Sequence, residues 1–364
     1  MDQKMMKTLG IVIAGFVVFI LIIFLIASCT NTKYTYEKLE EKMLSVAKNY
    51  YQNNEKELPS QDKDTRSYTL KKMISDGSID ELTELFDNEN IKCDGNVTVT
   101  NNNGYYVYTP YLTCGKDYQT TYLKDKIIEN SLVEAGAGLY ETSSEYIFKG
   151  DVKNNYVSFA GKTFRIIRIN EDNTIRLIDN IGISEVIWDS KYNTTVQDSN
   201  GVNDYVVDNN LYANIKNVSD NYYKNNNVWT DENRTYIATQ SLCIGKRSTS
   251  DTTKDGSTEC SLKLDNQLFG SLAVYEYLQA SLDKNCNNTT GSACTNYNWY
   301  TSISNSFWSV TANVSQTDRA FSIYKKPITT LCSSYNHLNV VFNLTSNVVY
   351  VDGDGTANNP YVFK

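Results

Sequence analysis

The longest uninterrupted apolar segment of the chain lies near its N-terminus. Leu9–Ala27 contains 19 residues without a charge, in the order LGIVIAGFVVFILIIFLIA. An α-helix rises about 1.5 Å per residue, so this segment is just long enough to cross a hydrocarbon core of roughly 30 Å. A helix satisfies its own backbone hydrogen bonds in lipid, so the many Ile and Val residues do not argue against it. The pattern therefore predicts a transmembrane helix over residues 9–27.

The charges before this segment set its expected orientation. Lys4 and Lys7 precede it, and Asp2 partly offsets them. Positive charge tends to stay on the cytoplasmic side of a membrane. We therefore expect residues 1–8 to form a cytoplasmic tail and the bulk of the chain to lie outside the cytoplasm, at the cell membrane.

Two other kinds of N-terminal segment are alternatives to an uncut helix. A secretory signal peptide has an apolar region of about 7–15 residues, which is shorter than this one. Ile26-Ala27-Ser28-Cys29 resembles a bacterial lipobox, with Cys29 as the candidate lipidated residue. The length of the apolar run favours the uncut helix, and either anchor would tether the product to the outer face of a membrane.

After the apolar segment, the hydrophobic period becomes that of an amphipathic helix. Five residues at spacings of 3, 4, 3 and 4 share one stripe, namely Tyr36, Leu39, Met43, Val46 and Tyr50. Charged side chains occupy the other face. We expect this helix to continue the membrane helix, or nearly so, and to pack its stripe against the next segments of the chain; a stalk and a dimeric coiled coil are the alternatives.

The next segments show first helical and then strand-like hydrophobic patterns. Ser67–Phe86 predicts two short helices, and Val97 and Val99 alternate with polar residues as in a strand. Asn101–Gly104 is a turn signal, and Tyr105–Leu112 reads as a second strand. These elements predict a small α+β domain over residues 34–120.

A helical linker is expected over residues 121–138, with a joint at Gly136-Ala137-Gly138. Residues 139–364 are expected to form a larger mixed α+β domain. Its predicted strands are Tyr156–Phe159, Thr163–Ile169, Thr174–Ile178, Val340–Leu344, Val348–Val351 and Pro360–Phe363, and its predicted helices are Asp208–Tyr223 and Leu272–Leu282.

Charge and cysteine content narrow the class of protein. The net charge is −8 and the chain has no Lys/Arg cluster, so nucleic acid is not an expected partner. Local spacing groups six of the eight cysteines into proposed disulfides, namely Cys93–Cys114, Cys243–Cys260 and Cys286–Cys294. Disulfides suit an extracytoplasmic location. Cys332 is left over, and a zinc site is not expected because C-x-x-C is absent and His337 is the single histidine.

Ordered motifs over residues 139–364 resemble a widespread, uncharacterised domain of surface proteins from Firmicutes and Mollicutes-like bacteria, the DUF6273 type. The matching segments are Leu139–Thr142, Tyr146–Asp151, Asn155–Arg168, Ile187–Asp189, Asn209–Tyr212, Gly270–Tyr277, Asn296–Trp299, Phe307–Ser309, Asn339–Leu344 and Gly353–Val362. Phe164 replaces the family's Trp, and Leu338-Asn339 replaces its Arg-Pro. The order of these motifs is also similar to C-type-lectin-like and formylglycine-generating-enzyme-like domains, which implies such a fold for this domain.

The N-terminal half resembles type IV pilins and pseudopilins, in which an apolar helix runs into an amphipathic one before a small disulfide-bonded sheet. A prepilin also carries a Gly-Phe-type cleavage site and an early Glu. Here Lys7-Thr-Leu-Gly10 opens the apolar run instead. This departure puts assembly into a pilus in doubt.

The chain offers little support for catalysis. No G-x-S-x-G, H-E-x-x-H, Walker or Rossmann pattern occurs, and a structural or surface role is favoured for His337. Cys332 would be the candidate thiol if the protein were a formylglycine-generating-type enzyme, but a buried unpaired thiol is favoured. We therefore expect neither an enzyme nor a bound cofactor.

The candidate ligand-binding residues are aromatic: Trp188, Trp299, Tyr300 and Trp308. Such rings stack on sugars, although the alternative is that they build the core of the domain. Asp352 and Asp354 resemble the start of a calcium loop, yet the remaining ligands of that motif are missing, which favours a turn. The expected function is non-enzymatic, adhesin-like binding of a glycan or a protein at the cell surface; the alternative is a pilin-like structural subunit.

Overall fold

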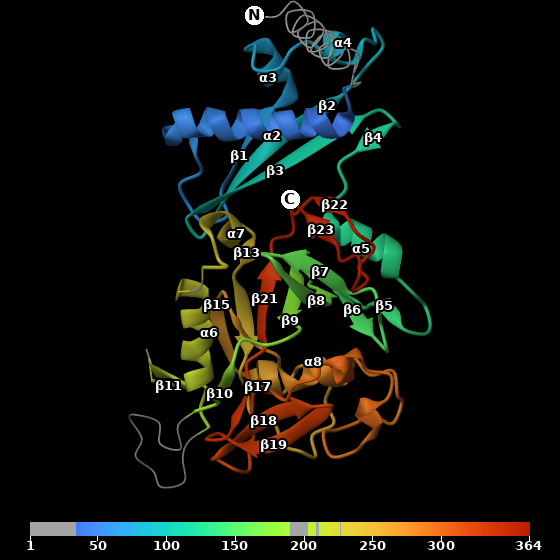
Figure 1. Ribbon diagram of the computed structural model, residues 1–364. Helices are drawn as coiled ribbons and strands as arrows, with labels where there is room; N and C mark the ends of the chain where they lie inside the picture. The colour runs from blue at the N-terminus through green and yellow to red at the C-terminus, as the bar shows by residue number, and fades with distance from the viewer. Residues whose placement is uncertain (1–33, 190–202, 209–210, 226) are drawn as a thin grey trace, which may run out of the picture. The chain divides into compact units, whose positions relative to one another are not determined.

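The computed structural model describes residues 34–189, 203–208, 211–225 and 227–364, and these residues form a mixed α+β protein that consists mostly of strands (Figure 1). They divide into two compact units. The N-terminal unit comprises residues 34–53, 68–97 and 110–119, and the C-terminal unit comprises residues 54–67, 98–109 and the described residues from 120 to 364.

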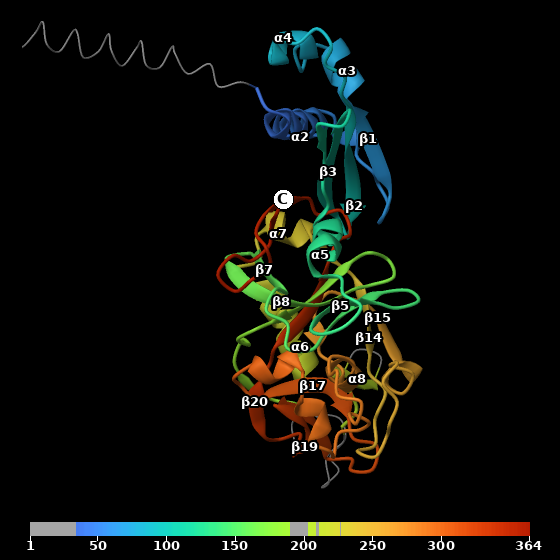
Figure 2. The same cartoon turned by 90° about the vertical axis from the view of Figure 1, so that its right-hand side faces the viewer.

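Helix α2 (Tyr36–Asn53) of the N-terminal unit lies on one face of a four-stranded sheet (Figure 2). Residues 65–67, 98–102 and 105–109 of this sheet belong to the C-terminal unit. The strands follow chain order: β1 (Thr65–Thr69), β2 (Asp94–Asn102), β3 (Tyr105–Cys114) and β4 (Tyr118–Gln119). Two short helices, α3 (Leu70–Ser75) and α4 (Leu82–Phe86), connect β1 to β2, as the sequence predicted; the short 3-10 helix η1 (Glu55–Glu57) precedes β1.

The apolar stripe of α2 is buried, but it is not quite the predicted stripe. Leu39 and Met43 are buried as expected, and the line continues through Ala47 and Tyr51. The buried residues follow a row of side chains four positions apart along the helix, and Val46 and Tyr50, beside that row, are only partly buried.

The predicted hairpin after α4 is confirmed. Strand β2 ends at Asn102 and β3 begins at Tyr105. Asn103 and Gly104 both have positive φ, 55° and 86°, which is the conformation that a tight two-residue hairpin turn requires. The predicted disulfide Cys93–Cys114 joins the residue before β2 to the last residue of β3, at the end of the hairpin away from the turn.

The C-terminal unit contains an eight-stranded sheet and a five-stranded sheet. The eight-stranded sheet has the order β13-β21-β9-β8-β6-β5, with β16 also paired to β21 and β7 to β8. Its strands are β5 (Gly138–Glu141), β6 (Tyr146–Lys149), β7 (Tyr156–Phe159), β8 (Lys162–Ile169), β9 (Ile175–Asp179), β13 (Ile237–Ala238), β16 (Gly270–Ser271) and β21 (Val340–Leu344). All these pairs are antiparallel.

The five-stranded sheet has the order β10-β20-β17-β18-β19. Its strands are β10 (Glu185–Ile187), β17 (Phe307–Ala312), β18 (Arg319–Tyr324), β19 (Lys326–Leu331) and β20 (Tyr335–His337). Three two-stranded sheets complete the β-structure: β11 (Val206–Asp208) with β12 (Leu211–Tyr212), β14 (Gln240–Cys243) with β15 (Lys263–Gln267), and β22 (Tyr350–Asp352) with β23 (Val362–Phe363).

The helices of the C-terminal unit are short. They are α5 (Leu123–Ser131), α6 (Asn214–Asn225), α7 (Asp231–Thr235) and α8 (Val274–Gln279), with 3-10 turns η2 (Glu259–Ser261), η3 (Ala293–Thr295) and η4 (Trp299–Ser302). Two predicted helices were too long. The predicted helix at 208–223 includes residues that pair as strands β11 and β12, and the predicted helix at 272–282 is helical only from Val274 to Gln279.

Aromatic rings fill the centre of the C-terminal unit. Phe164, Trp229, Phe269 and Phe342 are buried, and the Trp229 ring lies 5.1 Å from that of Phe269 and 5.7 Å from that of Phe342. Away from this cluster, the predicted disulfides Cys243–Cys260 and Cys286–Cys294 are also confirmed.

The structure contains no helix, within its described residues, that is long and apolar enough to cross a membrane. The predicted span at 9–27 and the candidate lipidated residue Cys29 lie outside those residues.

Candidate functional site

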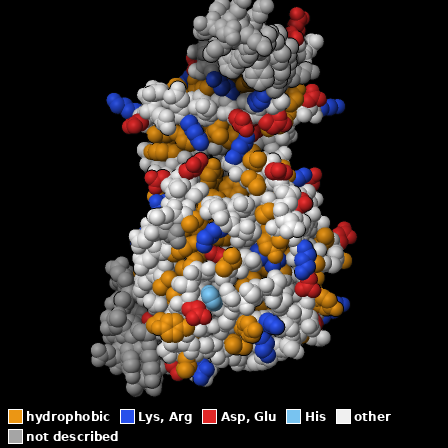
Figure 3. Space-filling view, viewed as in Figure 1, with side chains coloured by type: hydrophobic (Ala, Val, Ile, Leu, Met, Phe, Trp, Pro, Cys, Tyr) orange, Lys and Arg blue, Asp and Glu red, His pale blue; other side chains and the backbone are white. Residues whose placement is uncertain are grey.

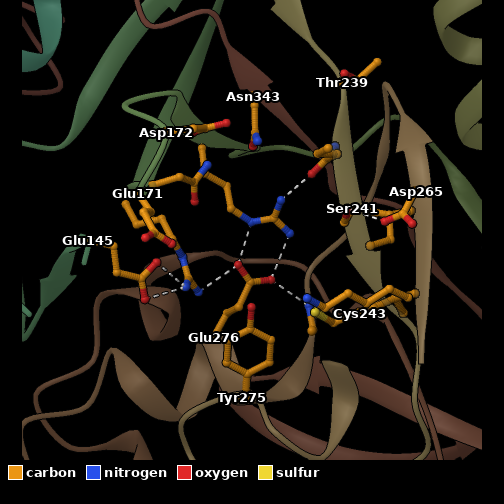
Figure 4. Close-up of a pocket in the computed structure, with 18 of the residues that line it drawn as sticks. Glu145, Glu171, Asp172, Thr239, Ser241, Cys243, Asp265, Tyr275, Glu276 and Asn343 are labelled. Atoms are coloured by element: carbon orange, nitrogen blue, oxygen red, sulfur yellow. Dashed lines mark hydrogen bonds and ion pairs between the residues drawn. The ribbon is translucent and has the colours of Figure 1, made fainter. Parts of the chain in front are cut away.

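A polar pocket of about 820 Å³ opens in the C-terminal unit (Figure 4). Its walls come from the turn between β8 and β9, from the β14–β15 hairpin and from the start of α8. Asn343 of β21 also lines it. Volumes of roughly 300–1,000 Å³ are typical of sites that bind small molecules.

The floor of the pocket is an ion cluster around Glu276. Arg168 on β8 and Arg176 on β9 are directly paired in the antiparallel register, so the two guanidinium groups start from adjacent strands. Arg168 Nη2 lies 2.9 Å from Glu276 Oε1, and Arg176 binds the same carboxylate through Nε at 2.6 Å and Nη2 at 3.0 Å. Glu276 therefore bridges two cations that would otherwise repel each other.

The start of α8 fixes the position of Glu276. The Glu276 Oε2 atom accepts a hydrogen bond of 2.9 Å from the backbone N–H of Ala273, the residue before the first turn of the helix. Carboxylates in a first helical turn are stabilised by the free N–H groups there. The same side chain thus caps the helix and binds both arginines, which leaves it little freedom to move.

Three more side chains contact the arginines of the cluster, and one of them is Gln279, whose Oε1 accepts from Arg168 Nη2 at 3.2 Å. Arg168 Nη1 donates to both oxygens of Glu145 at 3.1 Å, and Arg176 Nη1 donates to Gln240 Oε1. Gln240 is itself held by the carbonyls of Leu268 and Val341, at 3.0 and 3.1 Å. Two cations and two carboxylates therefore balance in charge at the bottom of the pocket.

Glu276 and Arg168 are held in their ionised forms. Burial alone would raise the pKa of Glu276, but Arg176 and Arg168 outweigh it, so the pKa lies below its ordinary value. Burial acts to lower the pKa of Arg168, but Tyr275 and Glu276 outweigh it, so that pKa is raised. A general acid or base needs a pKa near the working pH, so this cluster can bind and orient a ligand but is poorly suited to transferring protons.

The β14–β15 hairpin forms one wall of the pocket. Ser241 donates to Asp265 across it, and Cys243 ties it to Cys260. Tyr275, at the start of α8, contributes a partly exposed ring to the pocket, and the Arg168 guanidinium lies 5.3 Å from its centroid. The pocket thus combines fixed charges, amide and hydroxyl groups, and an aromatic ring.

The four aromatic residues predicted to bind a ligand lie in the core instead. Trp188, Trp299, Tyr300 and Trp308 are each at most 2% exposed. The indole N–H groups of the three tryptophans donate to backbone carbonyls: Trp188 to Ser309, Trp299 to Phe148 and Trp308 to Val186. The structure favours the alternative that the sequence left open, that these rings build the core.

Two side chains already lie against the Trp299 ring. The Arg165 guanidinium lies 4.5 Å from its centroid, and the Tyr300 ring stacks at 3.7 Å with an interplanar angle of 25°. A sugar could stack on this indole only after one of these neighbours had moved.

The remaining candidate residues have local structural roles. Asp352 Oδ1 accepts from the backbone N–H of Gly353, and Asp354 Oδ1 accepts from that of Thr356, so both carboxylates stabilise the turn before β23. Within the part of the chain that the structure describes, no group of three or more His, Cys, Asp or Glu side chains could hold a metal ion.

Cys332 and His337 lie apart from the pocket lining. Cys332 is buried and is the one described cysteine outside a disulfide. His337, the pale-blue side chain at the surface in Figure 3, has Nε2 3.8 Å from a carboxylate oxygen of Glu185. Because the other described cysteines are in disulfides, Cys332 has no second free thiol beside it among the described residues.

Sequence reasoning missed the residues that form the pocket floor, although a signal was present. Arg168 and Arg176 interrupt otherwise apolar strand segments, and Glu276 falls within a predicted helix. A charge at a position of a buried strand usually has a partner elsewhere in the chain. The sequence does not say which acid is that partner, because Glu276 is 100 residues or more away.

Comparison with known proteins gives no match for this chain among family models, curated proteins or solved structures.

Proposed function

We propose that the protein is a membrane-tethered, extracytoplasmic binding protein without enzymatic activity, whose C-terminal unit binds a glycan or a protein at the cell surface, as an adhesin does. The observation that carries this proposal is the polar pocket with its charge-balanced floor. A site built from immobile ionised groups is suited to recognition, because its donors and acceptors are already oriented before a ligand arrives.

The disulfides support an extracytoplasmic location. Three of them occur among the described residues, two in the C-terminal unit and one at the hairpin of the N-terminal unit. Disulfides persist in oxidising compartments and are rare in the cytosol. The apolar run at 9–27 supplies the proposed anchor, and the resemblance to DUF6273-type surface domains with a C-type-lectin-like fold fits the same location.

The orientation can be tested on intact cells that express the full chain. A protease added outside should digest the chain from residue 34 onward and leave an N-terminal fragment protected. Full protection in intact cells, with digestion only after lysis, contradicts the proposed location. Mass spectrometry of the mature N-terminus separates the two anchors, because lipidation would produce a new N-terminus at a diacylglyceryl Cys29.

Ligand binding can be tested with a variant that fills the pocket. Ser241 is exposed on the hairpin wall, so Ser241→Trp should block the pocket without disturbing the core. Ser304 is an exposed serine that does not belong to the pocket lining, and Ser304→Trp is the matched control. The full chain in mild detergent should bind members of a panel of glycans and surface proteins, and only Ser241→Trp should lose this binding. No binding to any member, or equal binding by both variants, rejects the proposal.

The alternative is a pilin-like structural subunit, and one observation favours it. The N-terminal unit places a helix on a small sheet that a disulfide closes, as the resemblance to pilins implies. In such assemblies, subunits associate through apolar helical surfaces. The stripe of α2 is already buried, with Leu39, Met43 and Ala47 fully covered, so this stripe is not free for assembly. Association of the full chain into filaments would nevertheless favour the subunit.

A further inference from the structure

One wall of the polar pocket carries a hydrogen-bond chain that fixes the orientation of a buried amide. The Thr174 hydroxyl donates to Asp172 Oδ1 at 2.6 Å, which uses its single proton. Thr174 Oγ1 can then only accept, and it does so from Asn170 Nδ2 at 2.9 Å and from Asn343 Nδ2 at 3.4 Å. The NH₂ group of Asn343 must therefore face Thr174, and its carbonyl oxygen must face elsewhere.

That carbonyl oxygen is an acceptor without a donor. Asn343 is 5% exposed and lines the pocket, and its Oδ1 finds no hydrogen-bond partner among the described residues. Figure 4 shows its amide pointing from the upper wall toward the ion cluster. Ser271, which is 1% exposed and also lines the pocket, has a hydroxyl oxygen that likewise finds no hydrogen-bond partner among the described residues. Buried acceptors of this kind are satisfied when a ligand or its bound water donates to them.

The charges of the pocket disfavour an anionic ligand. Arg168 and Arg176, its buried cations, are paired with Glu276 and Glu145 and donate to Gln240 and Gln279, so their charge is compensated within the cluster. One donor atom, Arg168 Nε, has no hydrogen-bond partner among the described residues. Of the exposed charged side chains in the lining, three are acidic and one is basic, namely Glu171, Asp172, Asp265 and Lys263. A ligand that carried carboxylate, sulfate or phosphate groups would meet a net negative wall.

From these observations we infer that the pocket selects a neutral, polyhydroxylated ligand, a sugar unit of a glycan, and that Asn343 is the specificity-determining residue that accepts a hydrogen bond from it. This inference rests on the proposed binding function and makes it narrower. Sugar hydroxyls can donate to Asn343 and Ser271 and accept from the amide and hydroxyl donors of the pocket. The volume of about 820 Å³ falls in the range of small-molecule sites.

The chain provides a close control for Asn343. Asn339 lies just before the same strand and is fully buried. Its Nδ2 donates to the carbonyl of Asp179 at 2.8 Å. Like that of Asn343, its Oδ1 has no hydrogen-bond partner among the described residues. It does not belong to the pocket lining. Asn343→Ala and Asn339→Ala thus remove the same kind of buried amide, but only the first removes an acceptor from the pocket.

The experiment measures binding of the full chain, in mild detergent, to an array of neutral glycans, of glycans with uronic or sialic acids, and of surface proteins. We expect binding to neutral glycans, weakened about 3- to 10-fold by Asn343→Ala and unchanged in Asn339→Ala. Preference for acidic glycans or for proteins, with binding lost in Ser241→Trp, overturns the sugar inference and leaves the binding function standing. Equal effects of the two alanine variants on neutral-glycan binding overturn the role of Asn343, and absence of all binding overturns the proposed function as well.

Discussion

At the scale of single residues, Glu276 joins both arginines of the pocket floor to the start of a helix. Its side chain is fully buried and contacts two arginines and a helix N-terminus. Paired charges in a protein interior are tolerated because each compensates the other, so loss of one partner costs far more than the pair contributes. The residue is therefore a structural determinant of the pocket as well as part of its floor.

Replacement of this carboxylate should destabilise the protein strongly. Glu276→Gln leaves two buried guanidinium groups with one carboxylate, and we expect it to lower the free energy of unfolding by about 3–5 kcal/mol. Glu145→Gln is the matched control, because Glu145 contacts Arg168 alone and its side chain is 23% exposed. Its loss should cost roughly 1 kcal/mol. Urea unfolding measures both, and equal losses would show that Glu276 has no special role.

A second residue-scale prediction concerns the thiol of Cys332. Burial, with Asp189 and Asp318 nearby, raises the pKa of this thiol, and only the thiolate reacts with alkylating reagents. In the folded protein at pH 8, iodoacetamide should therefore modify Cys332 at least about tenfold more slowly than in urea. Mass spectrometry of the peptide that contains Cys332 reports both rates. Equal rates would mean that the thiol is accessible in the folded protein.

At the scale of elements, the β14–β15 hairpin links the pocket to a disulfide. The bond Cys243–Cys260 closes a separation of 17 residues next to the wall residues Ser241 and Lys263, whereas Cys286–Cys294 closes 8 residues outside the pocket lining. The two bonds therefore offer a comparison between stability and the shape of the site.

Removal of each bond by paired Ser substitutions should separate these two effects. On the chain-entropy account, either double variant should lose about 3 kcal/mol of stability, and slightly more for the longer loop. Only Cys243→Ser/Cys260→Ser should also weaken ligand binding, because it frees the wall of the pocket. Thermal unfolding and a binding assay on the same samples test this. Equal binding by the two double variants would show that the wall keeps its shape without the bond.

The elements of the fold were predictable wherever a turn signal bounded a regular period. Strand β7 lies where the sequence predicts it, and Ala160 and Gly161, which separate it from β8, both have positive φ. The disulfides were predictable because each joins cysteines close in the sequence. Helix α6 was predicted to begin too early, because its apolar positions extend into a segment that pairs as β11 and β12.

The pocket could not be predicted in the same way, because its residues are separated widely in the sequence. Arg176 and Glu276 are 100 residues apart, and Asn343 and Thr174 are 169 apart. Periodicity reports which face of an element is buried, and it carries no information on which distant element covers that face. The tryptophans were the natural candidates by residue type, but burial removed their ring faces from solvent.

At the scale of the whole molecule, buried acids couple stability to pH. The pKa of Glu276 lies below its ordinary value of 4.5 because two arginines outweigh the effect of burial. A group of this kind stabilises the folded state fully above the unfolded pKa, and this stabilisation is lost as the pH falls through the folded pKa. Burial raises the pKa of Glu259 despite Arg247, so that residue acts with the opposite sign.

We therefore expect the contribution of Glu276 to persist at neutral pH and to decline as the pH falls below about 4.5. The measurement is the free energy of unfolding of the wild type and of Glu276→Gln as a function of pH. The difference between the two curves should be constant near pH 7 and should narrow in acid. A difference that stays constant down to low pH would show that the carboxylate is not ionised in the folded protein.

Because Glu276 binds two arginines at once, these three residues constrain how the sequence can evolve. Loss of any one of the three side chains leaves the buried cluster with an unbalanced charge, so single replacements pass through a destabilised intermediate. Arg168, Arg176 and Glu276 should therefore be inherited as a set and replaced as a set. Descendant sequences should carry either all three or an apolar substitute for all three, and chains with only two of them should be rare.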